Sequence, residues 1–471
     1  MKNHKFYLGL DQGSGSSKAI LLDSFGREVF TDTITVSTQH FDDGRVEQDA
    51  SELFLSIYSL FQNSIAHAKT LGGEIKTVGL SLQRSGVLAW DKEGNPQSSV
   101  LTWRDSRFKD EISKLSDHSD YIYHTTGLPL TYHYAAYKIG ALQKEFPMSY
   151  VGTLDSFFAY KLSGLKNFVS EESHASRSQL YSLEKRRWDP KLLEIFGVDI
   201  KRSPEIKPSF GDFGSLERIP VKVILGDQQA AFFGLNSPGA VVLIIGTFGT
   251  VIVPKNNLGS LKGYLTGVSY SKGSEISYQL EASINAPGQT IEFLKGTNDP
   301  INGIAEINKI LKGYAPIESS TIAFFPFQSS GSPHWKTDLK NIFNKEPKDK
   351  LELVSSLVEN IGNWIGCNFE KLIEADVVKG TNKLILAGGG SEIEYLVRYL
   401  KSLLGIEIYK ADNHHGSAYG AAYAALCADK PEFKNGEIGK EKISSNLDTS
   451  VIKKRYESWK ELYSKSLRKN L

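Results

Sequence analysis

Near its start the chain has the segment Phe6-Tyr-Leu-Gly-Leu-Asp-Gln-Gly-Ser-Gly-Ser-Ser-Lys18, an apolar strand that ends at Asp11 and runs into a turn of small residues. A second aspartate, Asp227, ends a similar strand in Val223-Ile-Leu-Gly-Asp-Gln-Gln229. Phosphoryl transfer uses one carboxylate to organise a metal ion and another to accept the proton of the attacking hydroxyl. The two aspartates therefore predict a phosphoryl-transfer site.

The turn after Asp11 is rich in glycine and serine. These residues let backbone N–H groups and hydroxyls approach phosphate oxygens, which a bulky side chain would prevent. A dinucleotide fingerprint would need a third glycine and a following helix, whereas Lys18 to Asp23 is typical of another strand. A hairpin that cradles the phosphates of a nucleotide is the functional interpretation, and an ordinary Gly/Ser hairpin is the alternative.

The length of 471 residues exceeds what one hydrophobic core supports, so two domains with a cleft between them are expected. The segment Asn236-Ser-Pro-Gly239 has the composition of a linker. It predicts an N-terminal domain of residues 1–235 and a C-terminal domain of residues 236–471.

The composition excludes several classes of protein. Lys plus Arg total 55 and Asp plus Glu total 54, which gives little support to a nucleic-acid partner and favours a small ligand. Two cysteines are too few for a disulfide framework, which indicates a reducing compartment. With no signal peptide and no run near ~18 apolar residues, we expect a cytoplasmic protein without a membrane span. A homodimer is left open.

Strand and helix patterns alternate along the first half, which is typical of sheets covered by helices. Asp49-Ala-Ser-Glu52 precedes apolar residues at helical spacing and predicts a helix over 49–65. Apolar runs predict strands over 7–10, 19–22, 78–82, 86–90 and 100–103.

After the linker the pattern restarts with Val241-Val-Leu-Ile-Ile-Gly-Thr-Phe-Gly-Thr-Val-Ile-Val253, two apolar strands joined by a Gly/Thr turn. Two hairpins of this kind suggest a duplicated architecture. The later patterns predict a helix over 351–372, a strand over 383–387 into a glycine turn, a helix from about residue 391, and an amphipathic closing helix over 451–467.

A series of short motifs runs along nearly the whole chain: Leu10-Asp-Gln-Gly13, Ser16-Ser-Lys18, Val46-Glu-Gln-Asp49, Leu82-Gln-Arg84, Thr102-Trp-Arg-Asp105, Asp155-Ser-Phe-Phe-Ala-Tyr-Lys-Leu-Ser-Gly164, His174-Ala-Ser-Arg177, Arg187-Trp-Asp189, Gly226-Asp-Gln-Gln-Ala-Ala231, Gly246-Thr-Phe-Gly-Thr250, Pro333-His-Trp335, Ala387-Gly-Gly-Gly390 and Gly420-Ala-Ala-Tyr423. In number, order and spacing, these motifs resemble those of the FGGY carbohydrate kinases, which include glycerol kinase and its sugar-kinase relatives. The resemblance implies a two-domain, duplicated α/β fold of the actin/hexokinase type, which is ribonuclease H-like and has an interdomain cleft.

Carried over to the matching positions, the resemblance implies an ATP-dependent kinase for a small polyol or open-chain sugar. Asp227 would be the general base, and Asp11 would hold Mg²⁺ together with Asp227. The N-terminal domain would bind the substrate and the C-terminal domain the nucleotide. ATP would be bound by Ser14, Gly15, Lys18, Gly249, Thr250, Gly388, Gly389 and Glu394. The substrate would be bound by Arg84, Ser85, Trp103, Asp105, His133, Asp227 and Gln228.

The pocket departs from that of glycerol kinases. Those enzymes place a glutamate after the pocket arginine, whereas Ser85 follows Arg84 here, and Glu394 stands where the family tends to have asparagine. Altered polar groups predict an altered ligand, with glycerol itself still allowed. Two other interpretations stay open: a sugar-binding regulatory protein without catalysis, and an actin-like ATPase.

Overall fold

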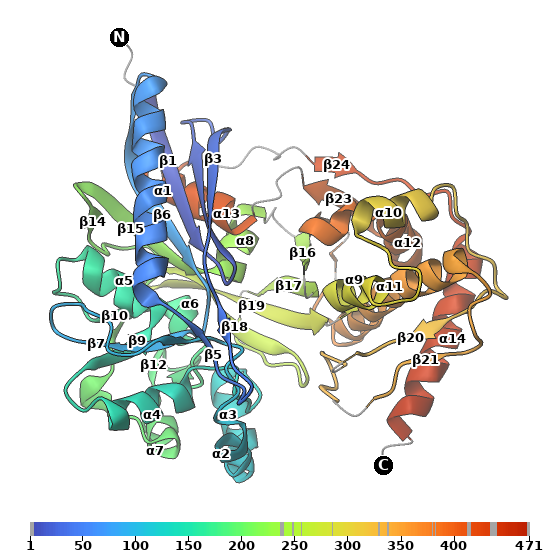
Figure 1. The fold of residues 1–471 in the computed structure, drawn as a ribbon, viewed down its shortest axis with the longest axis horizontal. Coiled ribbons are helices and arrows are strands. Elements are labelled where there is room, and N and C mark those ends of the chain that lie inside the picture. The colour runs from blue at the N-terminus through green and yellow to red at the C-terminus, as the bar shows by residue number, and fades with distance from the viewer. Residues whose placement is uncertain are drawn as a thin grey trace.

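The chain folds into two lobes that lie side by side, each built on a β-sheet with helices packed on it (Figure 1). We call the part around the six-stranded sheet the first lobe and the part around the seven-stranded sheet the second lobe. The residues described in this computed structural model are 4–235, 240–246, 249–255, 257–284, 286–327, 330–336, 339–378, 380–381, 383–411, 416–433 and 440–468.

The six-stranded sheet of the first lobe has the order β14-β15-β6-β1-β2-β3. Strand β6 pairs in parallel with both β1 and β15, whereas β1 and β2 form the antiparallel hairpin that the Gly/Ser turn predicted. The strands are β1 (His4–Gln12), β2 (Ser16–Leu22), β3 (Glu28–Thr35), β6 (Gly73–Leu82), β14 (Ser215–Leu216) and β15 (Ile219–Gly226).

A second, five-stranded sheet and most helices of the first lobe lie beside this sheet. Helix α1 begins after Asp49, whose side chain accepts hydrogen bonds from the backbone N–H groups of Ser51 and Glu52. The helices are α1 (Ala50–Thr70), α2 (Lys109–Ser113), α3 (Ser119–Thr126), α4 (Ala136–Glu145), α5 (Leu154–Leu162), α6 (Glu172–Ala175), α7 (Pro190–Phe196) and α8 (Asp227–Leu235). The five strands, in sheet order, are β4 (Gln39–His40), β5 (Val46–Gln48), β8 (Val100–Leu101), β7 (Val87–Trp90) and β9 (Tyr150–Thr153). Short strand pairs are β10 (Val169–Glu171) with β13 (Glu205–Lys207) and β11 (Tyr181–Ser182) with β12 (Arg187–Trp188).

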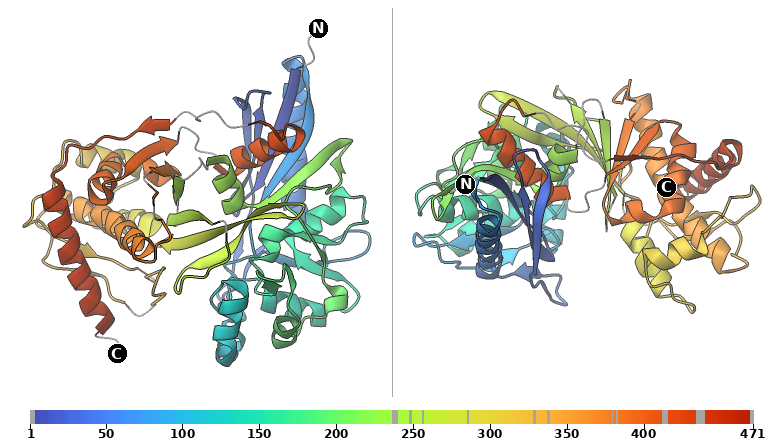
Figure 2. Two further views of the ribbon diagram at one scale, coloured as in Figure 1. Left: turned by 180° about the vertical axis from the view of Figure 1, so that it is seen from behind. Right: turned by 90° about the horizontal axis from the view of Figure 1, so that it is seen from above.

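The second lobe has a seven-stranded sheet with the order β18-β19-β17-β16-β22-β23-β24. The strands are β16 (Ala240–Ile245), β17 (Gly249–Lys255), β18 (Leu265–Lys272), β19 (Glu275–Ile284), β22 (Lys383–Ala387), β23 (Glu407–Ala411) and β24 (Lys440–Lys442), with a separate pair, β20 (Ala323–Phe324) and β21 (Ile342–Phe343). The helices that follow β19 in the chain are α9 (Ala286–Lys295), α10 (Ile304–Ile310), α11 (Lys350–Glu374), α12 (Glu394–Leu404), α13 (Gly416–Asp429) and α14 (Thr449–Arg468). Figure 2 shows α14 on the side of the second lobe that is far from the first.

Helix α13 leaves the second lobe and packs on the sheet of the first. Tyr7 of β1 donates a hydrogen bond to Asp429 at 2.7 Å, and Thr77 of β6 donates one to the Ala425 carbonyl at 3.0 Å. Ala418 and Ala422 share a buried cluster with Tyr7. The chain therefore returns to the first lobe after building most of the second.

The secondary structure confirms the local predictions closely. Helix α1, the hairpin strands β16 and β17, helix α11 and the closing helix α14 lie where the patterns placed them. Two details were wrong. Strand β15 ends at Gly226, so Asp227 is the first residue of α8, and the segment from residue 389 is a 3₁₀ turn (Gly389–Glu392) before α12 begins at Glu394. The predicted linker, Asn236 to Gly239, lies outside the described residues, so the domain boundary stays a prediction.

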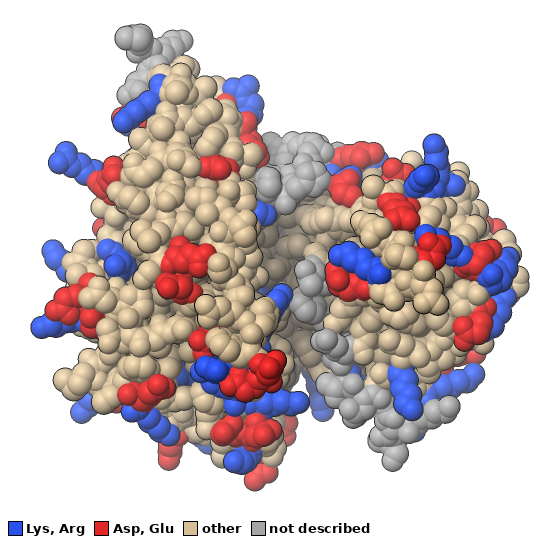
Figure 3. All heavy atoms as spheres, viewed as in Figure 1, with Lys and Arg blue, Asp and Glu red and all other residues tan. Residues whose placement is uncertain are grey.

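The surface carries charges of both signs. In Figure 3 a hollow separates the two lobes, and basic and acidic side chains are interspersed over the visible face. Among the described helices, none has the length and apolar character needed to cross a membrane.

Candidate active site

Asp11 and Asp227 lie at the same edge of the first sheet. Strand β6 separates their strands, and its residue Ser81 pairs with Asp11 on one side and with Leu225 of β15 on the other. Ser81 Oγ donates a hydrogen bond to Asp11 Oδ1 at 2.7 Å. Burial raises the pKa of Asp11 to about 7; the hydrogen bond from Ser81 opposes this rise, and the charge of Asp227 adds to it. The two carboxylates therefore act on one another, as a shared site requires.

Arg84 follows β6 and pairs with Asp227. Its Nε lies 3.1 Å from Asp227 Oδ1, and its Nη1 lies 3.1 Å from Glu281 Oε1. The backbone N–H of Gln228 donates a hydrogen bond to Asp227 Oδ1 at 2.8 Å, so this oxygen has one hydrogen-bond donor and one ion-pair partner. The structure thus brings together three residues that the resemblance assigned to the substrate: Arg84, Asp227 and Gln228.

Ser85 is buried, and its backbone has a positive φ of 64°, which is uncommon for a residue with a side chain. Its hydroxyl donates a hydrogen bond to the Arg177 carbonyl at 3.3 Å. In this conformation Ser85 fixes the bend that follows Arg84. It connects that bend to the segment after α6.

Trp103 and His133 form a second group of predicted substrate residues. Their rings are stacked with centroids 6.2 Å apart, and the Tyr132 ring also stacks on His133, with centroids 4.2 Å apart. Burial, with a smaller effect from Lys138, lowers the pKa of His133 to about 4, so the imidazole is neutral near pH 7. The ring centroid of its neighbour Tyr134 lies 5.7 Å from Arg177 Cζ. Tyr134 therefore connects this aromatic group to the residues around Arg84.

Asp105 is placed differently from the other predicted substrate residues. It is fully buried, and its carboxylate accepts hydrogen bonds from the backbone N–H of Val46 at 3.1 Å and from Arg107 Nη2 at 2.6 Å. Arg107 also pairs with Glu47. The Asp105 oxygens therefore hold neighbouring loops together.

The first predicted phosphate loop is the tip of the β1–β2 hairpin. The Ser14 carbonyl accepts hydrogen bonds from Thr38 Oγ1 and Gln48 Nε2, both at 2.9 Å, and Gly15 is exposed with open space around its Cα. Lys18 pairs in register with Asp11, and its charge is one of the factors that act against the raised pKa of Asp11. These hydrogen bonds fix the tip to the rest of the first lobe, and Gly15 is exposed at its outer surface.

The glycines of the second lobe meet at one edge of its sheet. Gly249 pairs with Ile245 across the β16–β17 hairpin, and Thr250 is the next residue of β17. Gly388 has a φ of 84°, and a Cβ built there would lie 2.6 Å from the Ile245 carbonyl oxygen, so the turn requires glycine. Gly389 has open space above it. These turns form one surface. The exposed Glu394 begins the nearby α12, where its backbone N–H donates to Asn308 Oδ1 at 3.0 Å.

The structure adds two residues to which the sequence assigned no role, Glu281 and Arg177. Glu281 lies in β19 with 2% of its surface exposed, and it pairs with both Arg84 and Arg177. The sequence carried no clear signal for Glu281, because Gln279, Glu281 and Ser283 alternate with apolar residues, a pattern typical of a strand with one solvent-facing side. Arg177 belongs to the motif His174-Ala-Ser-Arg177, but the sequence did not indicate its partner.

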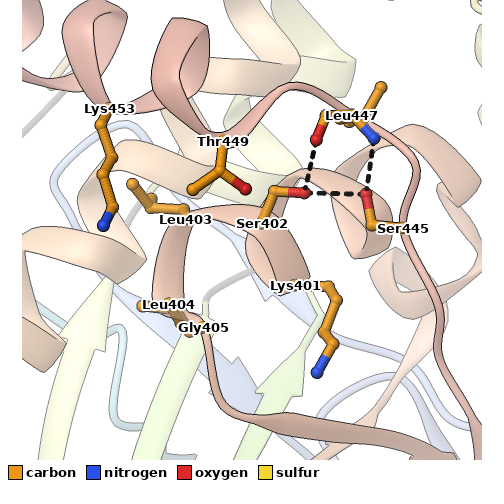
Figure 4. Close-up of a pocket in the computed structure, with 9 residues that line it drawn as sticks. All are labelled: Lys401, Ser402, Leu403, Leu404, Gly405, Ser445, Leu447, Thr449 and Lys453. Atoms are coloured by element: carbon orange, nitrogen blue, oxygen red, sulfur yellow. Dashed lines mark hydrogen bonds between the residues drawn. The ribbon is translucent and has the colours of Figure 1, made fainter.

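A separate surface pocket lies in the second lobe between the end of α12 and the start of α14 (Figure 4). Its polar groups bond to one another, since Ser402 Oγ and Ser445 Oγ lie 2.8 Å apart. Lys401, which also lines it, donates to the Ile406 carbonyl at 2.7 Å. None of the predicted site residues lines this pocket, so it is distinct from the candidate active site.

The two aspartates suit a hydrated cation that arrives with a nucleotide. Within the described ranges, no cluster of three or more His, Cys, Asp or Glu side chains could hold a metal ion. Mg²⁺ commonly takes one or two carboxylates and completes its shell with phosphate oxygens and water. Because Asp227 helps to raise the pKa of Asp11, a cation near both would relieve their repulsion. The donor set therefore fits Mg²⁺.

Comparisons with known proteins place the chain in a family. Residues 6–234 match the model for the N-terminal domain of the FGGY family of carbohydrate kinases. The chain belongs to this family. It is 28% identical over 451 residues to a glycerol kinase of Nostoc sp., covering 89% of each chain, and 27% identical over 490 residues to a glycerol kinase of Halalkalibacterium halodurans, covering 97% of each. This FGGY protein is a carbohydrate kinase, as the motifs predicted.

Solved structures confirm the fold of this FGGY protein. A Plasmodium falciparum glycerol kinase with ADP superimposes with a TM-score of 0.88 at 21% identity and covers 99% of each chain. A gluconate kinase from Lactobacillus acidophilus gives a TM-score of 0.85 at 16% identity and covers 98% of each. The predicted α/β fold of the actin/hexokinase type is therefore correct.

Proposed function

We propose that this carbohydrate kinase transfers the γ-phosphoryl group of ATP to a hydroxyl of a small polyol or open-chain sugar, with Asp227 as the general base. The observation that carries the proposal is the convergence of Asp11 and Asp227 at one sheet edge, with Arg84 bound to Asp227. The glycerol kinase and gluconate kinase names of its relatives support an acceptor of this class.

In this proposal the residues of the first lobe prepare the acceptor. Arg84 and the Gln228 backbone hold one oxygen of Asp227, and the carboxylate takes the proton as the substrate hydroxyl attacks. The neutral His133 and Trp103 present ring faces and ring nitrogens to a polar, uncharged ligand. Ser85 and Asp105 act by shaping the adjoining loops.

The nucleotide would lie between the hairpin tip of the first lobe and the glycine turns of the second. Ser14, Gly15 and Lys18 would meet its phosphates from one side, and Gly249 and Thr250 from the other. Gly388, Gly389 and Glu394 would flank the adenosine. Asp11 and Asp227 would hold Mg²⁺, which when bound offsets the negative charge of the phosphates. We place the domain boundary of this arrangement at residues 235 and 236.

A coupled ADP-release assay over a panel of polyols, ketoses and aldoses tests the reaction. We expect ADP release that depends on one acceptor of this panel. ATP hydrolysis without an acceptor would favour an actin-like ATPase, and sugar binding without turnover would favour a regulatory protein. Either result contradicts the proposal.

The variant Asp227→Asn tests the base. It keeps the size of the side chain but removes its ability to accept the proton, so we expect kcat to fall by about 10²–10⁴-fold with little change in ATP binding. Asp212→Asn is the matched control, because Asp212 is an exposed carboxylate elsewhere in the first lobe, with a side chain 74% exposed. An Asp227→Asn enzyme that turns over like the control would remove Asp227 from this role.

A further inference from the structure

Four charged side chains form a continuous ion-pair chain where the two lobes meet. Asp227 pairs with Arg84 at 3.1 Å, Arg84 pairs with Glu281 at 3.1 Å, and Glu281 pairs with Arg177 Nη2 at 3.2 Å. Gln279 Nε2 donates a further hydrogen bond to Glu281 Oε1 at 2.8 Å. The two carboxylates balance the two guanidinium groups, so the chain is neutral only as a complete set.

Glu281 comes from the second lobe, whereas its partners come from the first. Its strand β19 belongs to the seven-stranded sheet, and Figures 1 and 2 show β18 and β19 at the junction of the lobes. Arg84 follows β6 of the first sheet, and Arg177 follows α6. The neighbouring strand is fixed to the first lobe as well, because the Val268 N–H of β18 donates to Ser176 Oγ at 3.1 Å.

Glu281 is the carboxylate that both arginines share, and Arg84 Nη1 also contacts Gln229 Oε1 at 3.3 Å. Arg177 Nη1 is buried without a hydrogen-bond partner among the described residues, so the contact of Nη2 with Glu281 is its strong polar anchor. Burial lowers the pKa of Arg177, and the nearby charge of Arg84 lowers it further. Burial alone would raise the pKa of Glu281, but the charges of Arg177 and Arg84 outweigh that effect and lower it.

We propose that Glu281 is a positioning residue for the phosphoryl transfer proposed above: it holds Arg84 in the orientation in which Nε meets the base Asp227. Without this carboxylate, two guanidinium groups would share a buried space and repel one another. Arg84 is less enclosed than Arg177, since 15% of its side chain is exposed against 7%. Arg84 is therefore the group that moves, and Asp227 loses its partner.

The variant Glu281→Gln tests this proposal, because it keeps the volume and one acceptor oxygen, removes the charge and replaces the second oxygen with an NH₂ group. We expect its crystal structure to show Arg84 Nε displaced from Asp227 Oδ1. In the ADP-release assay, kcat should fall by about 10²-fold, because small misplacements near a reacting group have effects of this size. The KM for ATP should stay within about twofold, since Glu281 touches none of the proposed nucleotide residues.

Glu172→Gln is the matched control. Glu172 is also buried and also pairs with an arginine, Arg186, at 2.8 Å, but it has no contact with Arg84 or Asp227. It should keep both the Arg84–Asp227 contact and the wild-type kcat. The proposal is overturned if Glu281→Gln retains that contact, or if its kcat equals that of Glu172→Gln. Should the wild-type chain phosphorylate no acceptor, the proposed function fails, and the crystal structures still decide the role of Glu281.

Discussion

Lys138 shows how a single buried charge can organise the candidate site. Its side chain is 1% exposed, and its ammonium donates to the Thr102 carbonyl at 2.7 Å and to the His133 carbonyl at 3.5 Å. These carbonyls belong to the two segments that carry Trp103 and His133. Burial lowers the pKa of Lys138 to about 7, against a partly opposing effect of Asp105.

The variant Lys138→Met tests this lowered pKa. Between about pH 7 and 10.5, the unfolded wild-type chain binds a proton at this lysine that the folded chain does not, so its free energy of unfolding should rise with pH. Relative to Lys138→Met, the rise should approach ~1.4 kcal/mol per pH unit. Urea unfolding of both proteins from pH 6 to 9 measures the difference. Parallel curves would show that Lys138 stays charged in the folded protein.

At the scale of elements, a buried ion pair fixes helix α14 to the core of the second lobe. Arg455 is 1% exposed, and its Nε and Nη2 contact Glu359 Oε2 of α11 at 2.9 and 2.5 Å. Carbonyl groups of Ile317, Ser320 and Thr321 accept its remaining hydrogen bonds. One carboxylate and three carbonyl groups inside the core therefore bind the Arg455 guanidinium.

The variant Arg455→Met should be strongly destabilised, because it leaves the Glu359 carboxylate buried without its cation. We expect the free energy of unfolding to fall by roughly 3–5 kcal/mol. Lys454→Met is the control on the same helix, since the Lys454–Glu318 pair is 61% exposed on both sides and should contribute less than ~1 kcal/mol. Denaturant titrations compare the two. Equal losses would mean that the buried pair contributes no more than the exposed one.

For the whole molecule, α8 and α13 cross closely where the chain returns to the first lobe. A Cβ built at Gly234 of α8 would lie 2.7 Å from the Cα of Gly420 of α13, and one built at Gly420 would overlap the Ala230 carbonyl oxygen. Only glycine lets the two backbones approach this closely. Because α8 begins with Asp227, this crossing also supports the proposed base.

The variant Gly420→Ala should therefore loosen the whole assembly. We expect a loss of roughly 1–3 kcal/mol in the free energy of unfolding from the forced separation of the helices, together with a lower kcat. Gly416→Ala in the same helix is the control, because its Cβ would lie 3.4 Å from Ala231 Cβ, an ordinary contact. Thermal unfolding and the ADP-release assay measure both effects. A Gly420→Ala protein as stable and as active as the control would show that the close crossing is dispensable.

Much of the local structure could be predicted because short-range patterns determine it. Asp49 stands at the N-cap of α1 and predicted where this helix begins. The spacing of apolar residues in α11 and α14 predicted both of those helices. The aspartates at strand ends indicated the edge at which the site lies. The patterns could not reveal that the Asp105 carboxylate accepts a hydrogen bond from the Val46 backbone, because that contact joins residues far apart in the chain.

The sequence by itself determined the alternation of strands and helices, the two hairpins and the identity of the two aspartates. Apolar periodicity, helix caps and glycines act over a few residues, so the sequence alone is enough to recognise them. Only the tertiary structure decided that α13 returns to the first sheet and that Glu281 reaches Arg84 across the junction. Those contacts depend on how two sheets that are distant in the sequence pack together. The charges in a buried space balance one another only when the two sheets are in contact.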